Sequence, residues 1–393
     1  MIGPPFTIQG SKDSVNPIII ELKDSRFEYI MKKIGLIIIV VFAQLGCNIA
    51  QRPVGLQDYF NTPEVAQRAE AIFRGMTDEE RVAQMIVASL GNLGKPYEHV
   101  KPLIKKRKIG GIIFLSGDPN TFKAQIDEIN AMSAGWPLLM SMDAEPSLFN
   151  RRMPGTPEMP ATNTLKTDEQ IIEAVKVIDS TLHHVGFQQN FAPVVDLSAD
   201  NEAIGNRNFG LTTDEVLPRA LTFIEATQKD GIVATAKHFP GHGRVAGDTH
   251  KKLVYIDGEL TEVDIYQPLI DAGVLSIMVG HIAIENNEKY NTDGLPSTLS
   301  RVVVTDLLRD ELGFDGIIIT DAMNMGAVSA IPHCGLLAAM AGCDMILMPV
   351  NEEETINEIL AEMEMNPEFA QQVTESVLRI LKLKICLGME FNG

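Results

Sequence analysis

Residues 300–321 read SRVVVTDLLRDELGFDGIIITD, and this stretch combines an amphipathic segment, a glycine stop and an apolar run. After Ser300, apolar side chains recur at helical spacing and predict a helix that ends at Gly313. The apolar positions are Val304, Leu307, Leu308 and Leu312. Residues 316–320 are almost continuously apolar, which is typical of a strand buried on both faces of a parallel sheet. Asp321 follows this strand directly.

The same alternation of helix and strand continues through the chain from about residue 51. Apolar runs predict strands at residues 84–87, 111–114, 137–142, 190–195, 232–236, 275–279, 316–320 and 344–348. Capping residues predict helices from Thr167 to Gly186 and from Thr212 to Gly231. Eight strands that alternate with helices predict an α/β protein with a single-domain, TIM-like (β/α)8 barrel. The alternative is a doubly wound sheet, which would carry a glycine-rich phosphate loop after its first strand, and the sequence has none.

The composition indicates an acidic, folded protein. The 393 residues include 52 Asp and Glu against 33 Lys and Arg, and the net charge is −19. This charge argues against nucleic acid as the main partner, because duplex binding needs a clustered basic surface. A hydrophobic content of 45% argues against disorder. Four cysteines are too few for a disulfide scaffold, and the three beyond residue 50 are interpreted as buried free thiols.

The N-terminal region has the pattern of an export signal. Residues 31–47 read MKKIGLIIIVVFAQLGC, in which two lysines precede an apolar run. That run is shorter than the roughly 20 residues needed to span a bilayer, and it predicts a secretory signal peptide. A buried helix or strand is the alternative interpretation. We therefore divide the chain into an upstream mis-start or disordered segment (1–30), a signal (31–50) and the barrel (51–393).

The end of the predicted signal resembles a bacterial lipoprotein box. The sequence Leu45-Gly46-Cys47 places a cysteine where cleavage and lipidation would occur, although Gln44 stands where that pattern has an aliphatic residue. This pattern predicts an exported protein, periplasmic or attached to the outer membrane of a bacterium through lipidated Cys47.

Polar residues follow the predicted strands at the end where barrel enzymes carry their active sites. These residues are Asp143, Asp196, Lys237, His238, His281 and Asp321. For Asp321 the alternative to a catalytic role is a cap on a following helix. For Asp196 and His281 the sequence leaves open whether they bind a ligand or support the rim of the barrel.

Residues 237–250 read KHFPGHGRVAGDTH and hold three of the eight histidines of the chain. One interpretation is a flexible surface loop. A second is a zinc site built from imidazoles and a carboxylate, although Lys237 beside the cluster would repel a cation. A third is acid–base catalysis, because Asp248 lies two residues before His250 and can orient its imidazole.

Three segments carry a family resemblance. Residues 237–250, 295–328 and 190–210 resemble motifs of glycoside hydrolase family 3, in particular its β-N-acetylhexosaminidase branch. The resemblance implies a barrel with Asp321 as the catalytic nucleophile and a His250–Asp248 dyad as the acid–base pair. It further implies that the sugar is contacted by Lys237, His238, Arg207, Asp143 and Arg151. The resemblance implies neither a metal nor a cofactor.

One loop departs from the family pattern. The family usually has Asp-x-Glu-Gly-Gly after the third strand, whereas this chain has Asp143-Ala144-Glu145-Pro146-Ser147. Proline fixes φ and removes an N–H, so we expect a different loop path and a changed neighbourhood for Arg151.

The activity implied by the resemblance is that of a retaining exo-β-N-acetylglucosaminidase, which would act on small glycans or muropeptides through a covalent glycosyl-Asp intermediate. A single tryptophan and six tyrosines offer few stacking surfaces, which favours a small pocket over a long cleft. Three alternatives stay open: a β-glycosidase or glycoside phosphorylase of other sugar specificity, a non-catalytic sugar-binding lipoprotein, and a metal-dependent barrel hydrolase.

Overall fold

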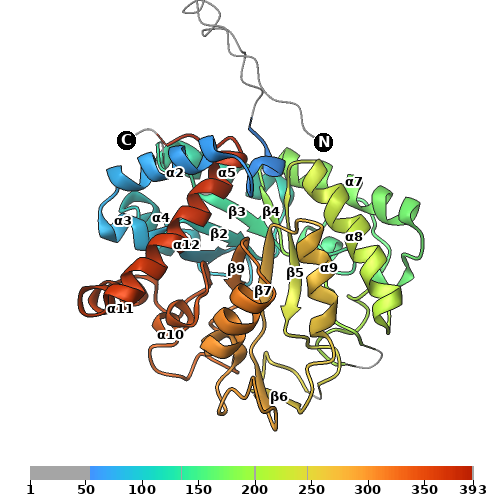
Figure 1. Cartoon of the computed structure of the whole chain (residues 1–393). Coiled ribbons are helices and arrows are strands. Elements are labelled where there is room, and N and C mark those ends of the chain that lie inside the picture. The colour runs from blue at the N-terminus through green and yellow to red at the C-terminus, as the bar shows by residue number, and fades with distance from the viewer. Residues whose placement is uncertain (1–53, 134, 199–200, 246, 392–393) are drawn as a thin grey trace, which may run out of the picture. The chain divides into compact units, whose positions relative to one another are not determined.

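Eight parallel strands lie side by side in their order along the chain, and helices surround them (Figure 1). The ring contains β1 (Ile86–Leu90), β2 (Gly111–Phe114), β3 (Leu139–Met142), β4 (Gln189–Asn190), β5 (Val233–Phe239), β7 (Ser276–Val279), β9 (Ile317–Thr320) and β10 (Ile346–Leu347). β1 pairs with β10, and a parallel bridge between Ile319 and Met345 joins β9 to β10 and closes the ring. The predicted (β/α)8 barrel is therefore confirmed.

The computed structural model describes residues 54–391, except for 134, 199–200 and 246. The predicted upstream segment and signal, with Cys47, lie outside these residues, so the proposed domain limits stay a prediction. Among the described residues, no helix combines the length and the apolar character needed to cross a bilayer. The three cysteines in this part are buried and free, as predicted.

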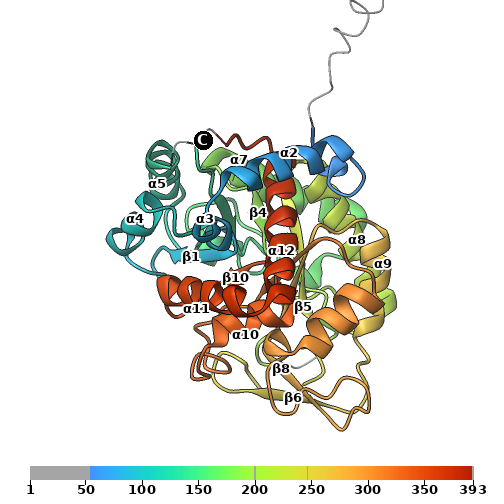
Figure 2. The ribbon, with the colours of Figure 1, turned by 60° about the vertical axis from the view of Figure 1, so that its left-hand side comes forward.

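Helices surround the strands, and most of them bury an apolar face against the barrel. They are α2 (Pro63–Gly75), α3 (Asp78–Ala83), α4 (Tyr97–Lys105), α5 (Pro119–Met132), α6 (Phe149–Arg152), α7 (Asp168–Val185), α8 (Thr213–Lys229), α9 (Tyr266–Asp271), the π-helix η5 (Val302–Glu311), α10 (Cys334–Ala341), α11 (Glu352–Met365) and α12 (Pro367–Cys386). Short 3-10 turns are η1 (Leu56–Asp58), η2 (Thr162–Thr164), η3 (Val263–Ile265) and η4 (Ser297–Leu299). In Figure 2, α12 crosses the front of the barrel, and it packs against α2 and α11.

At α7 the predicted helix signals act where the sequence placed them. The Thr167 side chain accepts the backbone N–H of Gln170 at the start of α7, and Gly186 ends that helix with a φ of 107°. Such a left-handed φ is one that glycine adopts without steric cost. At α8 the expected cap is different, because the Glu215 carboxylate accepts the backbone N–H of Leu211.

Several strand boundaries differ from the prediction: β1 covers residues 86–90 in place of 84–87, and β10 covers residues 346–347 in place of 344–348. The predicted strand 190–195 is regular only as far as Asn190, because Pro193 has no N–H to contribute to a ladder. β5 instead continues to Phe239 and includes two residues that were expected to follow it. A register shift between Lys237 and Phe239 marks a bulge in this strand, and bulges re-aim side chains near active sites.

A small second sheet was not predicted. β6 (Val254–Asp257) pairs in parallel with β8 (Ile282–Glu285), and β6 lies at the lower edge of Figure 1. β6 begins four residues after His250, while β8 begins directly after His281. This sheet therefore anchors the far end of the loop that carries the predicted dyad.

Candidate active site

The carboxyl ends of the barrel strands bring together two cations and two carboxylates. The Lys237 ammonium is only 1% exposed and lies 2.8 Å from Asp143 Oδ1 and 2.6 Å from Glu145 Oε1. The Arg207 guanidinium donates two hydrogen bonds to Glu145, at 2.8 and 2.7 Å. Such bidentate pairing holds both planar groups in one orientation. Glu145 therefore links the two cations that were predicted to bind the sugar.

These carboxylates stay ionised despite their burial. Burial acts to raise the pKa of Asp143, but Lys237 and Arg152 outweigh it and hold the pKa well below its usual range. For Glu145, burial is likewise opposed by Arg207 and Lys237, so its pKa is also lowered. An ionised, hydrogen-bonded network of this kind is rigid and offers fixed donors to a ligand.

The arginine that pairs with Asp143 is Arg152, at 2.9 Å. The neighbouring Arg151, which the resemblance placed on the sugar, has an exposed side chain, and its carbonyl oxygen accepts the hydroxyl of Ser116. Adjacent residues of a helix point in directions about 100° apart, so only one of the two can face the site. The Asp143 carboxylate thus pairs with Arg152, and the sugar contact expected of Arg151 stays a prediction.

Asp196 is a buried hub at the base of the histidine-rich segment. Its carboxylate accepts the backbone N–H groups of His238 and His242, at 3.1 and 2.8 Å, and contacts His238 Nδ1 at 2.7 Å. Burial acts to raise the pKa of Asp196, but His238 and His242 lower it by more than burial raises it, so the pKa lies below its usual value. Because a carboxylate only accepts, His238 Nδ1 carries a proton and Nε2 is left to face a ligand.

The three histidines of this segment have different partners. His238 binds Asp196, and His250 binds Asp248, whereas His242 contacts the amide of Asn201 and the hydroxyl of Thr249. Within the described part of the chain, no three His, Cys, Asp or Glu side chains are grouped so as to hold a metal ion. The geometry here is that of separate hydrogen-bonded pairs.

Asp321 follows β9 at the rim. Its Oδ1 accepts the backbone N–H of Ala322 at 2.8 Å, and its own N–H donates to the carbonyl of Val279. Burial raises the pKa of Asp321, but His238, His281 and the Ala322 N–H outweigh burial and lower it. The carboxylate is therefore ionised at neutral pH, as a nucleophile requires.

His281 supports the backbone beside Asp321. It is fully buried, with Nδ1 2.9 Å from the Thr298 hydroxyl and Nε2 3.0 Å from the Ala322 carbonyl oxygen. A carbonyl only accepts, so Nε2 carries the proton and donates it there. Burial lowers the pKa of His281, which keeps the ring neutral. In the structure, His281 thus supports the backbone of Ala322, the residue after Asp321.

The Asp248–His250 pair sits at the tip of the loop between β5 and β6. His250 Nδ1 lies 2.7 Å from Asp248 Oδ1, which also accepts the His250 backbone N–H at 2.9 Å. The His250 side chain is 63% exposed, whereas that of Asp248 is 15% exposed. The carboxylate fixes the tautomer with a proton on Nδ1, so Nε2 is free to donate or accept a proton.

The start of this loop is held by a carboxylate that the sequence did not single out. Glu262 accepts the backbone N–H groups of Gly243 and Arg244, and also that of Leu197 beside Asp196. Burial, together with Asp196, raises the pKa of Glu262 to about 7. No local pattern marks Glu262, because its three partners are distant in sequence.

We expect Glu145→Gln to lower the free energy of unfolding by on the order of 3 kcal/mol, because it leaves Lys237 and Arg207 with one fewer buried counter-ion. It should also raise KM, since both cations lose their fixed orientation. Urea unfolding and steady-state kinetics measure the two effects.

The matched control is Glu70→Gln, which alters an exposed ion pair with Arg74. Exposed pairs of this kind contribute about 0–1 kcal/mol, so this variant should behave as the parent does. Equal stability of the two variants would contradict the counter-ion role of Glu145.

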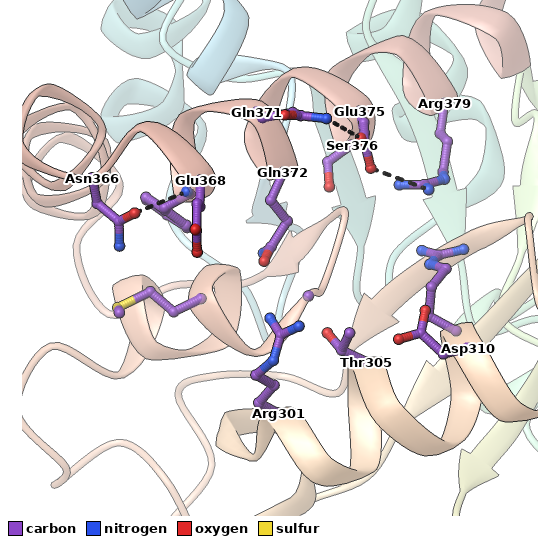
Figure 3. Close-up of a pocket in the computed structure, with 14 residues that line it drawn as sticks. Arg301, Thr305, Asp310, Asn366, Glu368, Gln371, Gln372, Glu375, Ser376 and Arg379 are labelled. Carbon is purple, nitrogen blue, oxygen red and sulfur yellow. Dashed lines mark hydrogen bonds and ion pairs between the residues drawn. The ribbon is translucent and has the colours of Figure 1, made fainter.

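A separate cleft of about 630 Å³ lies between η5, α10 and α12. Figure 3 shows Arg301 and Thr305 on one side, and Gln372 and Ser376 on the other. None of the residues discussed above as candidates for catalysis lines this cleft. The rim of the barrel remains the site where ionised and hydrogen-bonded groups converge.

Comparison of the sequence with known protein families identifies the family of this chain. Residues 77–383 match the glycosyl hydrolase family 3 N-terminal domain. A β-hexosaminidase of Vibrio cholerae serotype O1 is 30% identical over 274 residues, which are 66% of this chain and 81% of that protein. A β-N-acetylglucosaminidase/β-glucosidase of Cellulomonas fimi is 28% identical over 333 residues, or 80% of this chain and 58% of that protein.

A solved structure from the same family has a similar fold. The structure of a glycoside hydrolase family 3 β-N-acetylglucosaminidase from Paenibacillus sp. FPU-7 superimposes with a TM-score of 0.73 at 30% identity. The superposition covers 80% of this chain and 63% of that one. The chain thus spans less than two thirds of some relatives, while the family domain itself is matched over more than three quarters of the present sequence. The chain belongs to glycosyl hydrolase family 3.

Proposed function

We propose that the protein is a retaining exo-β-N-acetylglucosaminidase. The observation that supports this most directly is that the loop with the Asp248–His250 pair contacts, through the His250 carbonyl, the loop that follows the ionised Asp321. The names of the relatives from Vibrio cholerae and Paenibacillus favour N-acetylhexosamine as the sugar.

In the first step, an Asp321 carboxylate oxygen bonds to the anomeric carbon while the bond to the glycosidic oxygen breaks. The protonated His250 gives its Nε2 proton to that oxygen, so the aglycone leaves as a neutral alcohol. Asp248 stabilises the imidazolium before transfer and keeps the Nδ1 proton in place afterwards. The product is a covalent glycosyl-Asp321.

In the second step, neutral His250 accepts a proton at Nε2 from water, and the water oxygen bonds to the anomeric carbon. The bond to Asp321 breaks, which restores the carboxylate and the imidazolium. Two displacements at one carbon retain the β configuration. Lys237 and Arg207 would donate to sugar hydroxyls through N–H groups that their buried carboxylate partners leave unused, and His238 Nε2 would accept a hydrogen bond from a hydroxyl.

The position of the single tryptophan favours an exo mode of action. Trp136, the single tryptophan, precedes β3, contacts Phe391 and lies at the opposite end of that strand from Asp143. It therefore cannot stack on a sugar at the rim, and long-chain binding usually needs such surfaces. We propose terminal β-linked N-acetylglucosamine on small glycans or muropeptides as the substrate.

A screen of aryl glycosides tests the proposal. Aryl β-N-acetylglucosaminide should be cleaved faster than aryl β-glucoside and aryl β-xyloside, and proton NMR should show the β-anomer of the free sugar first. Preference for another sugar would overturn the specificity. Faster turnover with phosphate, and a sugar phosphate as product, would indicate a phosphorylase in place of a hydrolase.

We also propose that the protein is exported and anchored through lipidated Cys47. This proposal depends on the sequence pattern of residues 31–47 alone. Metabolic labelling with a fatty-acid analogue in a bacterial host should tag the parent but not Cys47→Ser. Equal labelling of both would contradict anchoring at this cysteine.

A further inference from the structure

The loop that carries His250 meets the loop that follows Asp321 at Gly326. The Gly326 N–H donates a hydrogen bond of 3.2 Å to the carbonyl oxygen of His250. A Cβ at position 326 would lie only 2.8 Å from the Lys251 carbonyl oxygen and 3.0 Å from that of His250. The two backbones are therefore as close as a residue without a side chain allows.

Gly326 is held firmly relative to Asp321. Between them, Met325 donates to the Ala322 carbonyl in a tight turn, and the Met323 N–H donates to Leu347 at the end of β10. A displacement of residue 326 would thus be resisted by the barrel itself. Any change in packing at this glycine should move the opposite loop.

The opposite loop has most of its other described supports away from its tip. Its start is held by Asp196 and Glu262, through the backbone N–H groups of His242, Gly243 and Arg244. Its far end enters β6, which pairs with β8. At the tip, Thr249 hydrogen-bonds to His242 of the same loop, and an exposed ion pair of 3.9 Å joins Lys251 to Glu202, whereas the backbone carbonyl of His250 reaches outside the loop to Gly326.

We propose that Gly326 is a positioning residue, which docks the loop of the acid–base pair onto the loop of the nucleophile. Docking fixes the separation between His250 and Asp321, the two groups that must act on opposite sides of one glycosidic carbon. This inference deepens the proposed function and depends on it for its catalytic consequence.

Gly326→Ala tests the proposal, and Gly75→Ala is the matched control. At the end of α2, a Cβ on residue 75 would meet nothing within 4 Å, and neither glycine has a left-handed φ. A misplacement of about 1 Å can cost about 10²-fold in rate. We expect a loss of about 10- to 100-fold for Gly326→Ala on aryl glycosides with poor leaving groups, a much smaller loss on the dinitrophenyl glycoside, and parental rates for Gly75→Ala.

A double-mutant cycle distinguishes an effect on the position of His250 from a loss of activity that arises elsewhere in the protein. In a His250→Ala background, Gly326→Ala should cause no further loss, because a residue that acts through His250 has nothing left to position. Losses that multiply in the double variant would overturn the proposal. So would equal losses on all leaving groups.

Hydrogen exchange provides a readout that does not need activity. The amides of residues 247–252 should exchange faster in Gly326→Ala than in the parent and in Gly75→Ala. Unchanged exchange would show that Gly326 does not dock the loop. A parent chain that cleaves no aryl glycoside would contradict the proposed function, while the exchange comparison would still decide the docking.

Discussion

Asp321→Ala should abolish the hydrolysis of aryl β-N-acetylglucosaminides, with a loss of kcat on the order of 10⁴–10⁶-fold, the scale on which removal of a covalent nucleophile acts. The physical reason is that the other carboxylates described at the carboxyl ends of the strands are held by cations or histidines and are not placed to attack. Asp143 and Glu145 are engaged by Lys237, and Asp196 by His238. Steady-state kinetics and circular dichroism together measure the loss and show that the fold is kept.

Asp321→Asn removes the negative charge at nearly constant shape and should be almost as inactive. Asp214→Asn makes the same change at an exposed position of α8 and should leave activity intact. A fluorinated glycoside should trap a covalent adduct on the peptide that contains Asp321. Full activity of Asp321→Ala, or an adduct on another residue, would disprove the mechanism.

His250→Ala should have the second-largest effect, and its size should depend on the leaving group. General acid catalysis contributes about 10²–10⁴-fold, so glycosides of poor leaving groups should lose this much in kcat/KM. A dinitrophenolate leaves without protonation, so its glycoside should lose little in the first step. Azide should then accelerate the second step, because it attacks the glycosyl-enzyme without needing a base.

The matched control is His99→Ala, since His99 is an exposed residue of α4, one of the helices that surround the strands. It should change neither kcat/KM nor the leaving-group dependence. If His250→Ala lowered kcat/KM equally on every aryl glycoside and azide had no effect, His250 would not be the acid and base.

The strands and the three helices predicted by range could be found, apart from their exact ends, because their signals are local. The run at 316–320 is apolar at nearly every position, as a strand buried on both faces must be, and β9 occupies residues 317–320. The Thr167 cap and the Gly186 stop delimit α7 in the same way. Asp321 could be placed at the rim because it directly follows such a strand, and barrel strands all end on one face.

Arg152 shows where local reasoning fails. Whether position 151 or 152 faces Asp143 depends on where α6 begins, and α6 begins at Phe149 after a loop that contains Pro146 and Ser147. Ser147 bonds to Thr162 and to the Asn206 carbonyl, far along the chain. The direction of the Arg152 side chain thus depends on contacts between residues far apart in the sequence, which residue spacing cannot predict.

By itself, the sequence determined the barrel, the order of its strands and the polar residues at their ends, because apolar periodicity and capping act between near neighbours. Only the tertiary structure decided that Glu145 links Lys237 to Arg207 and that the His250 carbonyl contacts Gly326. These pairs are separated by 62 to 92 residues in the chain and meet only when the ring closes. Burial then makes each contact specific, because a charge or backbone group removed from water must find its partner.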